Sequence, residues 1–479
     1  MDVRKTPSLG RVAIFRSPGM GHLIPCVEFA KLLFRRGFSV TLISFTVSST
    51  QSEAEISVLE ALPKAINAAT LPPPSMNDMA QTSKIGTRLW VAAARSRISL
   101  SDLLKDLPPQ ERLVALVVDL FGIQASEVAQ EFDVPCYLFF TTSLLNLRFV
   151  LDFPKLDETI SGEFRDAKEP IKLPGCLPVR GIDLCDTVQE RSDEVYSWYL
   201  QFCWRCRNVK SIFVNSFAEL EPDVIRALKE DPDLPEIYPV GPLVRSLEDE
   251  EMEQWECLRW LDKQPNDSVL FVSFGSGGTL SSAQLQELAM GLEMSEQRFL
   301  WVVRSSNEES NSAAFLTVGG GASKAEATFS YLPDGFVSRN LSKGLGFVVA
   351  SWGPQVRVLS HSATGGFMSH CGWNSTLESL MNGVPIIAWP LYAEQYMNVV
   401  MLVEGLRVAI RADAAGEREK GGVVGREAIA CAVRALMEGE EGMTMRSRMQ
   451  GLRAAAKRAL GEKGSCREVL LSQISSRTS

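Results

Sequence analysis

WGPQVRVLSHSATGGFMSHCGWNSTLESLMNGVPIIAWPLYAEQ, residues 352–395, is the stretch from which the rest of the chain is best interpreted. Within it an apolar run at 366–368 leads into His370-Cys371-Gly372, and a helical pattern opens at Trp373. This order predicts a strand, a glycine turn and a helix N-terminus. Exposed backbone N–H groups and the positive end of the helix dipole attract a phosphate at such a place. The stretch therefore predicts a phosphate site at the start of a helix.

Polar side chains of the same stretch extend that site. Asn374 and Ser375 add hydrogen-bond donors at the helix start, and His370 adds another just upstream. Glu378 lies one turn into the helix, on the face of Asn374 or Ser375. A carboxylate there suits a ribose diol, because it accepts hydrogen bonds from two hydroxyls. These residues predict a nucleotide diphosphate as the ligand.

Both ends of the stretch carry groups suited to the remaining parts of such a ligand. Trp352 offers a flat face for a base, and Glu394 and Gln395 offer hydrogen-bonding groups for sugar hydroxyls. The stretch as a whole thus favours a nucleotide sugar.

Composition limits the classes of protein that fit. A chain of 479 residues is too long for one ordinary core, so two domains are expected. Its hydrophobic content of 45% and net charge of -9 predict a soluble globular protein that does not bind nucleic acid. No run has the length of a membrane span, and no apolar segment precedes the first strand, so no secretory signal is expected. We expect a cytoplasmic protein.

Cysteine usage agrees with a reducing compartment. Ten Cys are scattered through the chain, and Cys203 and Cys206 form its CxxC pair. A redox or zinc role for this pair requires a second pair or a preceding strand and turn. Neither is present, so we interpret the pair as helical core. Three His in the whole chain exclude a histidine-rich metal cluster.

The N-terminal region predicts a βαβ unit with a glycine turn. Residues 11–17 and 38–45 are the expected strands, and a helical pattern follows the turn. A nicotinamide oxidoreductase is disfavoured, because Ile24 stands at the third glycine position and residues 38–50 contain no acid for a ribose.

His22 sits in this first turn, at or just inside a helix N-terminus, where the dipole disfavours imidazolium. A neutral imidazole is what a general base requires, although a helix-cap role is the structural alternative. Asp119 follows the fourth expected strand, 113–118, which neighbours the first in the usual doubly wound order. The two side chains are therefore expected in one crevice, unless Asp119 caps the helix that starts near Gly122.

A second glycine turn follows the expected strand 268–274, and we assign Ser276 there to a phosphate contact. Two α/β halves, each with a glycine turn, predict two doubly wound Rossmann-like domains facing across a cleft. The expected boundaries are 1–242 for an acceptor-binding domain, 243–253 for a linker, 254–460 for a nucleotide-sugar-binding domain and 461–479 for a C-terminal helix that packs back on the first domain.

The stretch 352–395 closely resembles the signature box of plant UDP-dependent glycosyltransferases of family 1, from its Trp start through HCGWNS to its Gln end. SPGMGHLIP, VVDLFG, WLDKQP, SVLFVSFGSGGTLS and LPDGF look like further family segments. Gly353 is a departure, since Ala is more usual there, and we expect little effect. The resemblance implies the two-domain GT-B architecture, and the chain looks most like the branch that glucosylates hydroquinone and monolignols.

Carried over residue by residue, the resemblance places the catalytic base on His22 and its partner on Asp119. Gln395 at the end of the box suggests glucose as the donor sugar. Ser17, beside His22, is a further expected contact near the phosphates. The donor contacts fall on Ser276, Trp352, Gln355, His370, Gly372, Trp373, Asn374, Ser375, Glu378, Glu394 and Gln395.

The sequence thus predicts an inverting UDP-glucose-dependent glucosyltransferase that acts on a hydroxyl of a small phenolic or flavonoid-type metabolite. UDP-glucose is the co-substrate, and no metal, cofactor or protein partner is expected; we expect a monomer. The nearest alternative is C-glucosylation of a flavonoid-type ring, and a nucleotide-sugar-binding protein without turnover is a third. Apolar and aromatic positions of the first half are the expected acceptor pocket: Leu89, Trp90, Phe121, Leu144 and Trp198.

Overall fold

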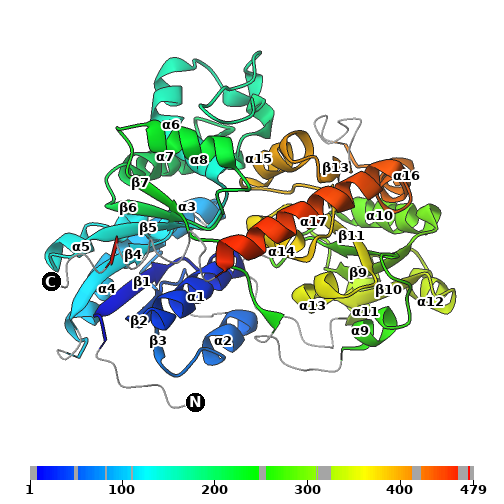
Figure 1. Ribbon diagram of the computed structural model, residues 1–479, viewed down its shortest axis with the longest axis horizontal. Helices are drawn as coiled ribbons and strands as arrows, with labels where there is room; N and C mark the ends of the chain where they lie inside the picture. Colours follow the sequence, from blue (N-terminus) through cyan, green and yellow to red (C-terminus); the bar gives the residue numbers. More distant parts are fainter. Residues whose placement is uncertain are drawn as a thin grey trace. The chain divides into compact units, whose positions relative to one another are not determined.

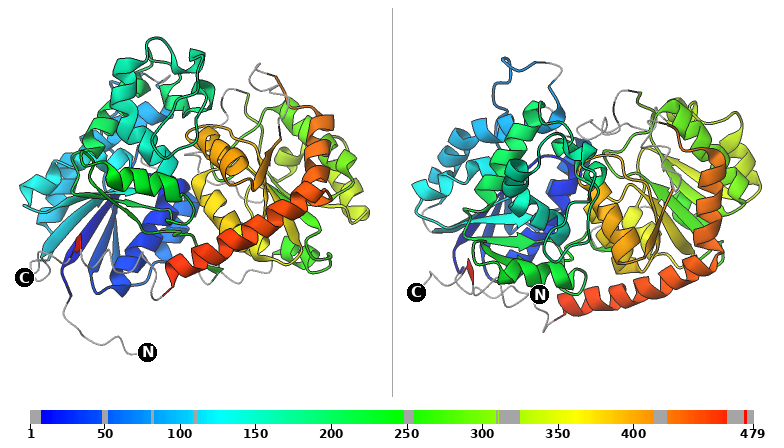
Figure 2. Two further views of the ribbon diagram at one scale, coloured as in Figure 1. Left: turned by 45° about the horizontal axis from the view of Figure 1, so that its top comes forward. Right: turned by 90° about the horizontal axis from the view of Figure 1, so that it is seen from above.

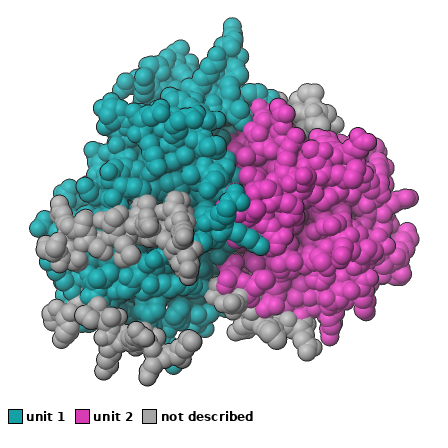
Figure 3. Space-filling view, viewed as in Figure 1, with its two compact units in different colours: residues 1–244, 457–479 teal, residues 245–456 magenta. Residues whose placement is uncertain are grey.

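The computed structural model describes residues 8–47, 52–80, 83–108, 112–247, 255–308, 310, 325–412, 422–461 and 473–474. The chain forms two compact units (Figure 3). The first contains Met1–Val244 and Lys457–Ser479, and the second contains Arg245–Ala456. The predicted linker, 243–253, lies largely outside the described residues, as does most of the predicted C-terminal helix.

A parallel sheet of seven strands forms the centre of the first unit, in the order β3-β2-β1-β4-β5-β6-β7 (Figure 1). The central strands contain continuous apolar runs, at 12–15 in the first strand and 113–118 in the fourth, and are mostly buried, as parallel strands covered by helices require. The strands are β1 (Arg11–Arg16), β2 (Ser39–Ser44), β3 (Ile66–Thr70), β4 (Leu113–Val118), β5 (Cys136–Phe140), β6 (Ser211–Val214) and β7 (Glu236–Pro239). The predicted neighbourhood of the first and fourth strands is confirmed, because β1 pairs with β4.

Helices cover both faces of this sheet (Figure 2). They are α1 (Met20–Arg35), α2 (Glu53–Glu60), α3 (Ile85–Arg95), α4 (Arg97–Lys105), α5 (Val128–Glu131), α6 (Leu144–Thr159), α7 (Glu194–Cys206) and α8 (Pro222–Glu230), with 3-10 turns at Phe121–Ala125, Phe164–Asp166, Gly181–Asp183 and Asp186–Val188. Cys203 and Cys206 are fully buried in α7, which confirms their interpretation as helical core.

Two secondary-structure predictions for this unit were wrong. The single helix expected over 83–107 is two helices, α3 and α4, which meet at Ser96. The loop expected over 154–193 is helical at its start, because α6 continues to Thr159 with Pro154 inside it. α6 lacks an amphipathic signal since it is buried on nearly all sides from Leu144 to Leu151, and its Ser143 cap accepts a hydrogen bond from the N–H of Asn146.

The second unit has a six-stranded parallel sheet in the order β10-β9-β8-β11-β12-β13. Its strands are β8 (Val269–Ser273), β9 (Arg298–Val303), β10 (Gly346–Ala350), β11 (Thr364–Ser369), β12 (Ile386–Ala388) and β13 (Ala409–Arg411). Its helices are α9 (Glu256–Leu261), α10 (Ser282–Ser295), α11 (Ala325–Phe329), α12 (Phe336–Ser342), α13 (Gln355–Ser360), α14 (Trp373–Asn382), α15 (Gln395–Val400) and α16 (Arg426–Met437), followed by α17 (Glu440–Leu460). β8 pairs directly with β11, so the glycine turns after these two strands lie at the same edge of the sheet.

The described C-terminal residues contact the first unit. Ile474 is 2% exposed within the core formed by α1, β1 and β2, and the Tyr137 hydroxyl donates to the Gln473 carbonyl at 2.8 Å. Among the described residues no helix is both long enough and apolar enough to cross a membrane.

Candidate active site

His22 and Asp119 are in direct contact in the first unit. His22 lies in the first turn of α1, and Asp119 directly follows β4. Because β1 and β4 pair in parallel, both residues stand at the carboxyl edge of the sheet. The His22 Nδ1 atom is 2.9 Å from an Asp119 Oδ2 atom that is closed to solvent. The structure therefore brings these two side chains together, as expected.

Asp119 is held by a full set of donors. Its carboxylate accepts from the Ser17 N–H and from the Ser17 hydroxyl, both at 2.7 Å, and from the Gly122 N–H at 3.0 Å. Burial opposes the charged form, but the hydrogen bonds and charge of His22 and the donors of Ser17 outweigh it, so the pKa of Asp119 is lowered. Asp119 therefore makes both contacts weighed from the sequence, one with His22 and one with the turn at Gly122.

The contact with Asp119 defines the chemistry that His22 offers. Nδ1 carries the proton that the carboxylate accepts, so Nε2 of the neutral ring has a lone pair. The His22 side chain retains 14% exposure, whereas Asp119 retains none. This arrangement suits an imidazole that takes a proton at Nε2 while a buried carboxylate fixes its tautomer.

An aromatic group adjoins His22. The Phe121 ring lies 5.6 Å from the imidazole, between centroids, and Trp90 lies 4.6 Å from Phe121. Of the five predicted acceptor residues, Phe121 and Trp198 keep partial exposure. The other three are closed to solvent, at 2% for Leu89, 1% for Trp90 and 0% for Leu144. Phe121 is the predicted residue that the structure brings against His22.

The phosphate-site turn of the second unit connects β11 to α14. Cys371 has a left-handed backbone with φ of 61°, and Gly372 caps the helix that begins at Trp373. The His370 ring is packed against this glycine and against Gly275 from the turn after β8. A β-carbon on Gly372 would lie 2.4 Å from His370 Nε2, and one on Gly275 would lie 2.6 Å from it. Both glycines are therefore needed to make room for the imidazole.

His370 is 7% exposed, and burial lowers its pKa to about 4. The ring is thus neutral at physiological pH, with one N–H to donate. Among the described residues its buried Nδ1 has no hydrogen-bond partner. A buried polar atom without a protein partner beside a helix N-terminus fits the predicted phosphate contact.

Gln355 connects two residues of the predicted nucleotide site, Ser375 and Glu378. Its Nε2 donates to Ser375 Oγ at 2.9 Å and to Glu378 Oε2 at 2.7 Å. The Glu378 carboxylate is thereby oriented on the face of α14 that carries Ser375, as predicted for a ribose contact. Trp352, three residues before Gln355, is 40% exposed and so has a free face.

The other residues predicted to bind the nucleotide sugar differ in solvent exposure. Trp373 is 3% exposed, so its main chain rather than its ring is available at the start of α14. Asn374, Ser276 and Glu394 keep partial exposure. Gln395 is 3% exposed, and its Oε1 accepts from the N–H groups of Leu391 and Tyr392 at 2.8 and 3.1 Å.

Arg304 was missed by sequence reasoning. Its guanidinium follows β9 and donates to the carbonyls of Gly275, at 3.2 Å, and Ser276. Burial lowers the pKa of Arg304. No feature of the sequence relates Arg304 to that turn, because Gly275 lies 29 positions earlier in the chain.

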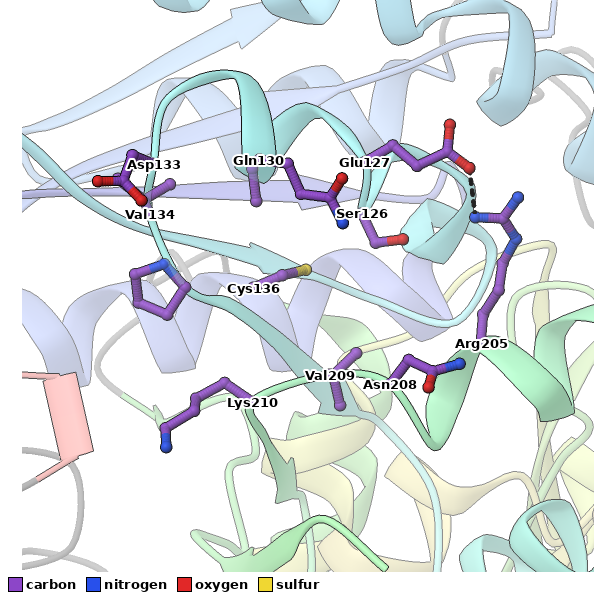
Figure 4. A pocket seen from close by; sticks show the side chains of 12 residues that line it. Ser126, Glu127, Gln130, Asp133, Val134, Cys136, Arg205, Asn208, Val209 and Lys210 are labelled. Carbon is purple, nitrogen blue, oxygen red and sulfur yellow. Dashed lines mark hydrogen bonds and ion pairs between the residues drawn. The ribbon is translucent and has the colours of Figure 1, made fainter.

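A pocket of the first unit lies elsewhere. Figure 4 shows this pocket of about 690 Å³, which adjoins the start of β5 at Cys136 and an ion pair of 2.9 Å between Glu127 and Arg205. The start of a strand is the opposite edge of the sheet from Asp119, and no predicted site residue lines the pocket.

Comparisons with known proteins agree with this geometry. A family model described as UDP-glucoronosyl and UDP-glucosyl transferase matches residues 231–440. The chain is 48% identical over 461 residues to a hydroquinone glucosyltransferase of Rauvolfia serpentina, covering 96% of each chain.

Two solved structures have similar folds. The structure of Phytolacca americana UGT2 complexed with UDP-2fluoro-glucose and pterostilbene has a TM-score of 0.87 and 44% identity, over 98% of this chain and 100% of that chain. A complex between a UDP-glucosyltransferase from Polygonum tinctorium capable of glucosylating indoxyl and 3,4-dichloroaniline has a TM-score of 0.89 and 42% identity, over 98% and 99%.

Proposed function

The chain belongs to the plant family 1 UDP-glycosyltransferases, with their GT-B fold, and we propose that it transfers glucose from UDP-glucose to a hydroxyl group of a small phenol such as hydroquinone. The observation that carries the proposal is the contact of 2.9 Å between His22 Nδ1 and the buried Asp119 carboxylate. It supplies a base with a defined tautomer, which an acceptor hydroxyl needs in order to become a nucleophile.

The reaction follows from these groups. His22 Nε2 removes the proton from the acceptor hydroxyl as the oxygen attacks the anomeric carbon, and the bond between that carbon and the UDP oxygen breaks. Asp119 stabilises the imidazolium that forms. A single displacement inverts the anomeric centre, so an α-linked donor gives a β-glucoside.

The second unit is proposed to hold the donor. The start of α14 with His370, and the glycine turn at Ser276, stabilise charge that develops on the departing diphosphate. Glu378 accepts from the ribose hydroxyls, and Trp352 stacks on the base. Gln395 and Glu394 bind the sugar. UDP-glucose is the expected donor, as predicted from Gln395.

The acceptor assignment draws on the relative from Rauvolfia serpentina, which is named for hydroquinone. That relative does not favour C-glucosylation, the alternative predicted from the sequence. A flavonoid-type acceptor, a cytoplasmic location and a monomeric state remain predictions.

The test is mass spectrometry of reactions that contain UDP-glucose or UDP-galactose and a panel of hydroquinone, other phenols and flavonoids, followed by acid hydrolysis of the product. We expect an acid-labile hexose adduct on hydroquinone and a preference for UDP-glucose. An acid-stable adduct would contradict O-transfer, and a preference for UDP-galactose would contradict the donor assignment. A panel without any adduct, while UDP binds, would favour a binding protein.

A further inference from the structure

A second charged pair lies beside the turn that carries His22. Arg16, the last residue of β1, is 1% exposed, and Glu55 of α2 is 6% exposed. Their closest atoms, Arg16 NH1 and Glu55 Oε1, are 3.2 Å apart. Neither residue was identified from the sequence, and neither takes part in the proposed proton transfer.

Both members of this pair also bind the main chain of the turn. Arg16 NH1 donates to the Ser17 carbonyl at 2.8 Å, and Glu55 Oε1 accepts from the Gly19 N–H at 2.6 Å. Gly19 precedes α1 with φ of 97°, and His22 lies three residues beyond it. The Ser17 N–H donates to Asp119, so Asp119 and Arg16 bind the two main-chain polar groups of Ser17. Three side chains, those of Arg16, Glu55 and Asp119, thus bind the main chain of this turn.

The start of α2 shows where Glu55 is directed. Ser52 caps α2, and its side chain accepts from the Glu55 N–H at 3.1 Å. Ser52 and Glu55 have the spacing of a capping box, in which the glutamate returns to the N-cap N–H. Here the Glu55 Oε1 atom accepts from Gly19 and from Arg16 instead. The carboxylate connects α2 to the start of α1.

Stability alone is a weak reason for such a pair. Removing a guanidinium and a carboxylate from water is costly, and well-packed apolar residues in their place are often neutral or stabilising. Removing one partner is different, since it leaves an uncompensated buried charge. Replacing both residues by apolar ones can therefore remove the contacts to the turn without lowering the stability of the protein.

We propose that Arg16 and Glu55 are positioning residues, which hold the turn at Ser17 and Gly19 and thereby fix His22 against Asp119. The proposal rests on the proposed role of His22 as the base. Loss of both residues lets the start of α1 move, so Nε2 spends less time in line with the acceptor proton. Misplacement of a catalytic group by about 1 Å can cost on the order of 100-fold in rate.

The experiment compares the R16M/E55L double variant with E55L, E55Q and H22A. Each enzyme is assayed with UDP-glucose and two acceptors of similar size: hydroquinone, which is protonated at the assay pH, and a nitrophenol that is ionised there. The ionised phenol does not need the base, so a fault in the base lowers only the rate on hydroquinone. A general loss of folded enzyme lowers both rates, and thermal melting of each variant checks this.

For R16M/E55L we expect a melting temperature near that of the wild type, above that of E55L. We expect its kcat on hydroquinone to fall roughly 10- to 100-fold, while the rate on the nitrophenol stays within about 3-fold. E55Q retains an acceptor oxygen for the Gly19 N–H, so its rate on hydroquinone should exceed that of E55L.

Wild-type kcat on hydroquinone in the double variant, or an equal loss on both acceptors, would overturn the positioning role. The H22A variant shows whether such a result contradicts only the positioning role or also the proposed function. If H22A itself keeps full activity on hydroquinone, the base assignment is wrong. If H22A loses that activity and R16M/E55L does not, the base assignment stands and the positioning role is wrong.

Discussion

The imidazole of His370 fills the space that a side chain on Gly275 would occupy. A β-carbon on Gly275 would lie 2.5 Å from His370 Cε1, and Gly275 has φ of 74°, which other residues rarely adopt. Since β8 and β11 are adjacent, the turn of one strand borders on the histidine of the other. The two glycine turns therefore lie together with His370 between them, at the proposed phosphate site.

Gly275→Ala should consequently damage both stability and nucleotide binding. Displacing His370 and imposing a left-handed backbone on alanine should lower the free energy of unfolding by about 1–3 kcal/mol. We also expect weaker UDP binding, because His370 and the adjacent turn move together. Urea unfolding and calorimetric titration with UDP measure the two effects.

Gly451→Ala is the matched control. Gly451 lies within α17, where a β-carbon would meet nothing within 4 Å. Alanine should stabilise this helix by about 0.5–1 kcal/mol and leave UDP binding unchanged. Equal behaviour of the two variants would contradict the tight packing of His370 against Gly275.

The titration of His370 predicts a loss of stability in acid. Burial lowers its pKa from 6.5 to about 4, so the unfolded chain binds the proton more readily. The stability that comes from the neutral ring is complete above pH 6.5 and is lost as the pH falls towards 4. At pH 5 the loss should be about 2 kcal/mol, from 1.36 kcal/mol per pH unit.

The measurement is the free energy of unfolding of wild type and H370Q at pH 7.5 and pH 5. Carboxylates titrate in both proteins, so their contribution cancels in the difference in free energy of unfolding between wild type and H370Q. The change in this difference between pH 7.5 and pH 5 reports on His370. We expect the wild type to lose more stability than H370Q over this interval. An unchanged difference would mean that the imidazole is accessible to protons in the folded enzyme.

Asp119→Asn tests the tautomer argument. The carboxylate accepts from His22, twice from Ser17 and from Gly122, and an amide nitrogen cannot accept at any of these places. We expect kcat on hydroquinone to fall about 10²- to 10⁴-fold, the scale of general-base catalysis, with a smaller loss on an ionised nitrophenol. The control is Asp102→Asn, whose side chain on α4 is 64% exposed. A fall of under about 3-fold would contradict the orienting role.

Much of the fold could be predicted because its determinants are local. Apolar runs such as residues 113–118 can be recognised as buried parallel strands, and the usual doubly wound order placed Asp119 beside His22. α6 could not be recognised, because it is buried on nearly all sides from Leu144 to Leu151 and so has no polar face there to show a period, and Pro154 lies inside it. The end of α3 at Ser96 has no glycine or proline to mark it.

The site was predictable where a motif carries its own geometry, as at residues 370–378. Contacts between distant segments were not. Glu55 reaches Gly19 across 36 positions, and Arg304 reaches the carbonyl of Gly275 across 29. No periodicity or spacing relates such residues; only the packing of one element on another brings them together.

Gln395 gives the sharpest test of sugar recognition. The sequence predicted a side chain that both donates to and accepts from sugar hydroxyls. In the structure Oε1 accepts from the N–H groups of Leu391 and Tyr392, so Nε2 is the donor that we propose for the sugar. Gln395→Glu keeps an acceptor for both N–H groups, removes that donor and adds a buried negative charge.

For this variant we expect the Kd for UDP to stay within about 3-fold of wild type, because Gln395 is proposed to contact the sugar and not the nucleotide. The kcat/KM for UDP-glucose should fall about 10- to 100-fold, the cost of one lost hydrogen bond plus a buried carboxylate. Calorimetry with UDP and steady-state kinetics with UDP-glucose measure the two quantities. Weakened UDP binding would show that Gln395 supports the nucleotide site, and unchanged kinetics would show that Nε2 does not reach the sugar.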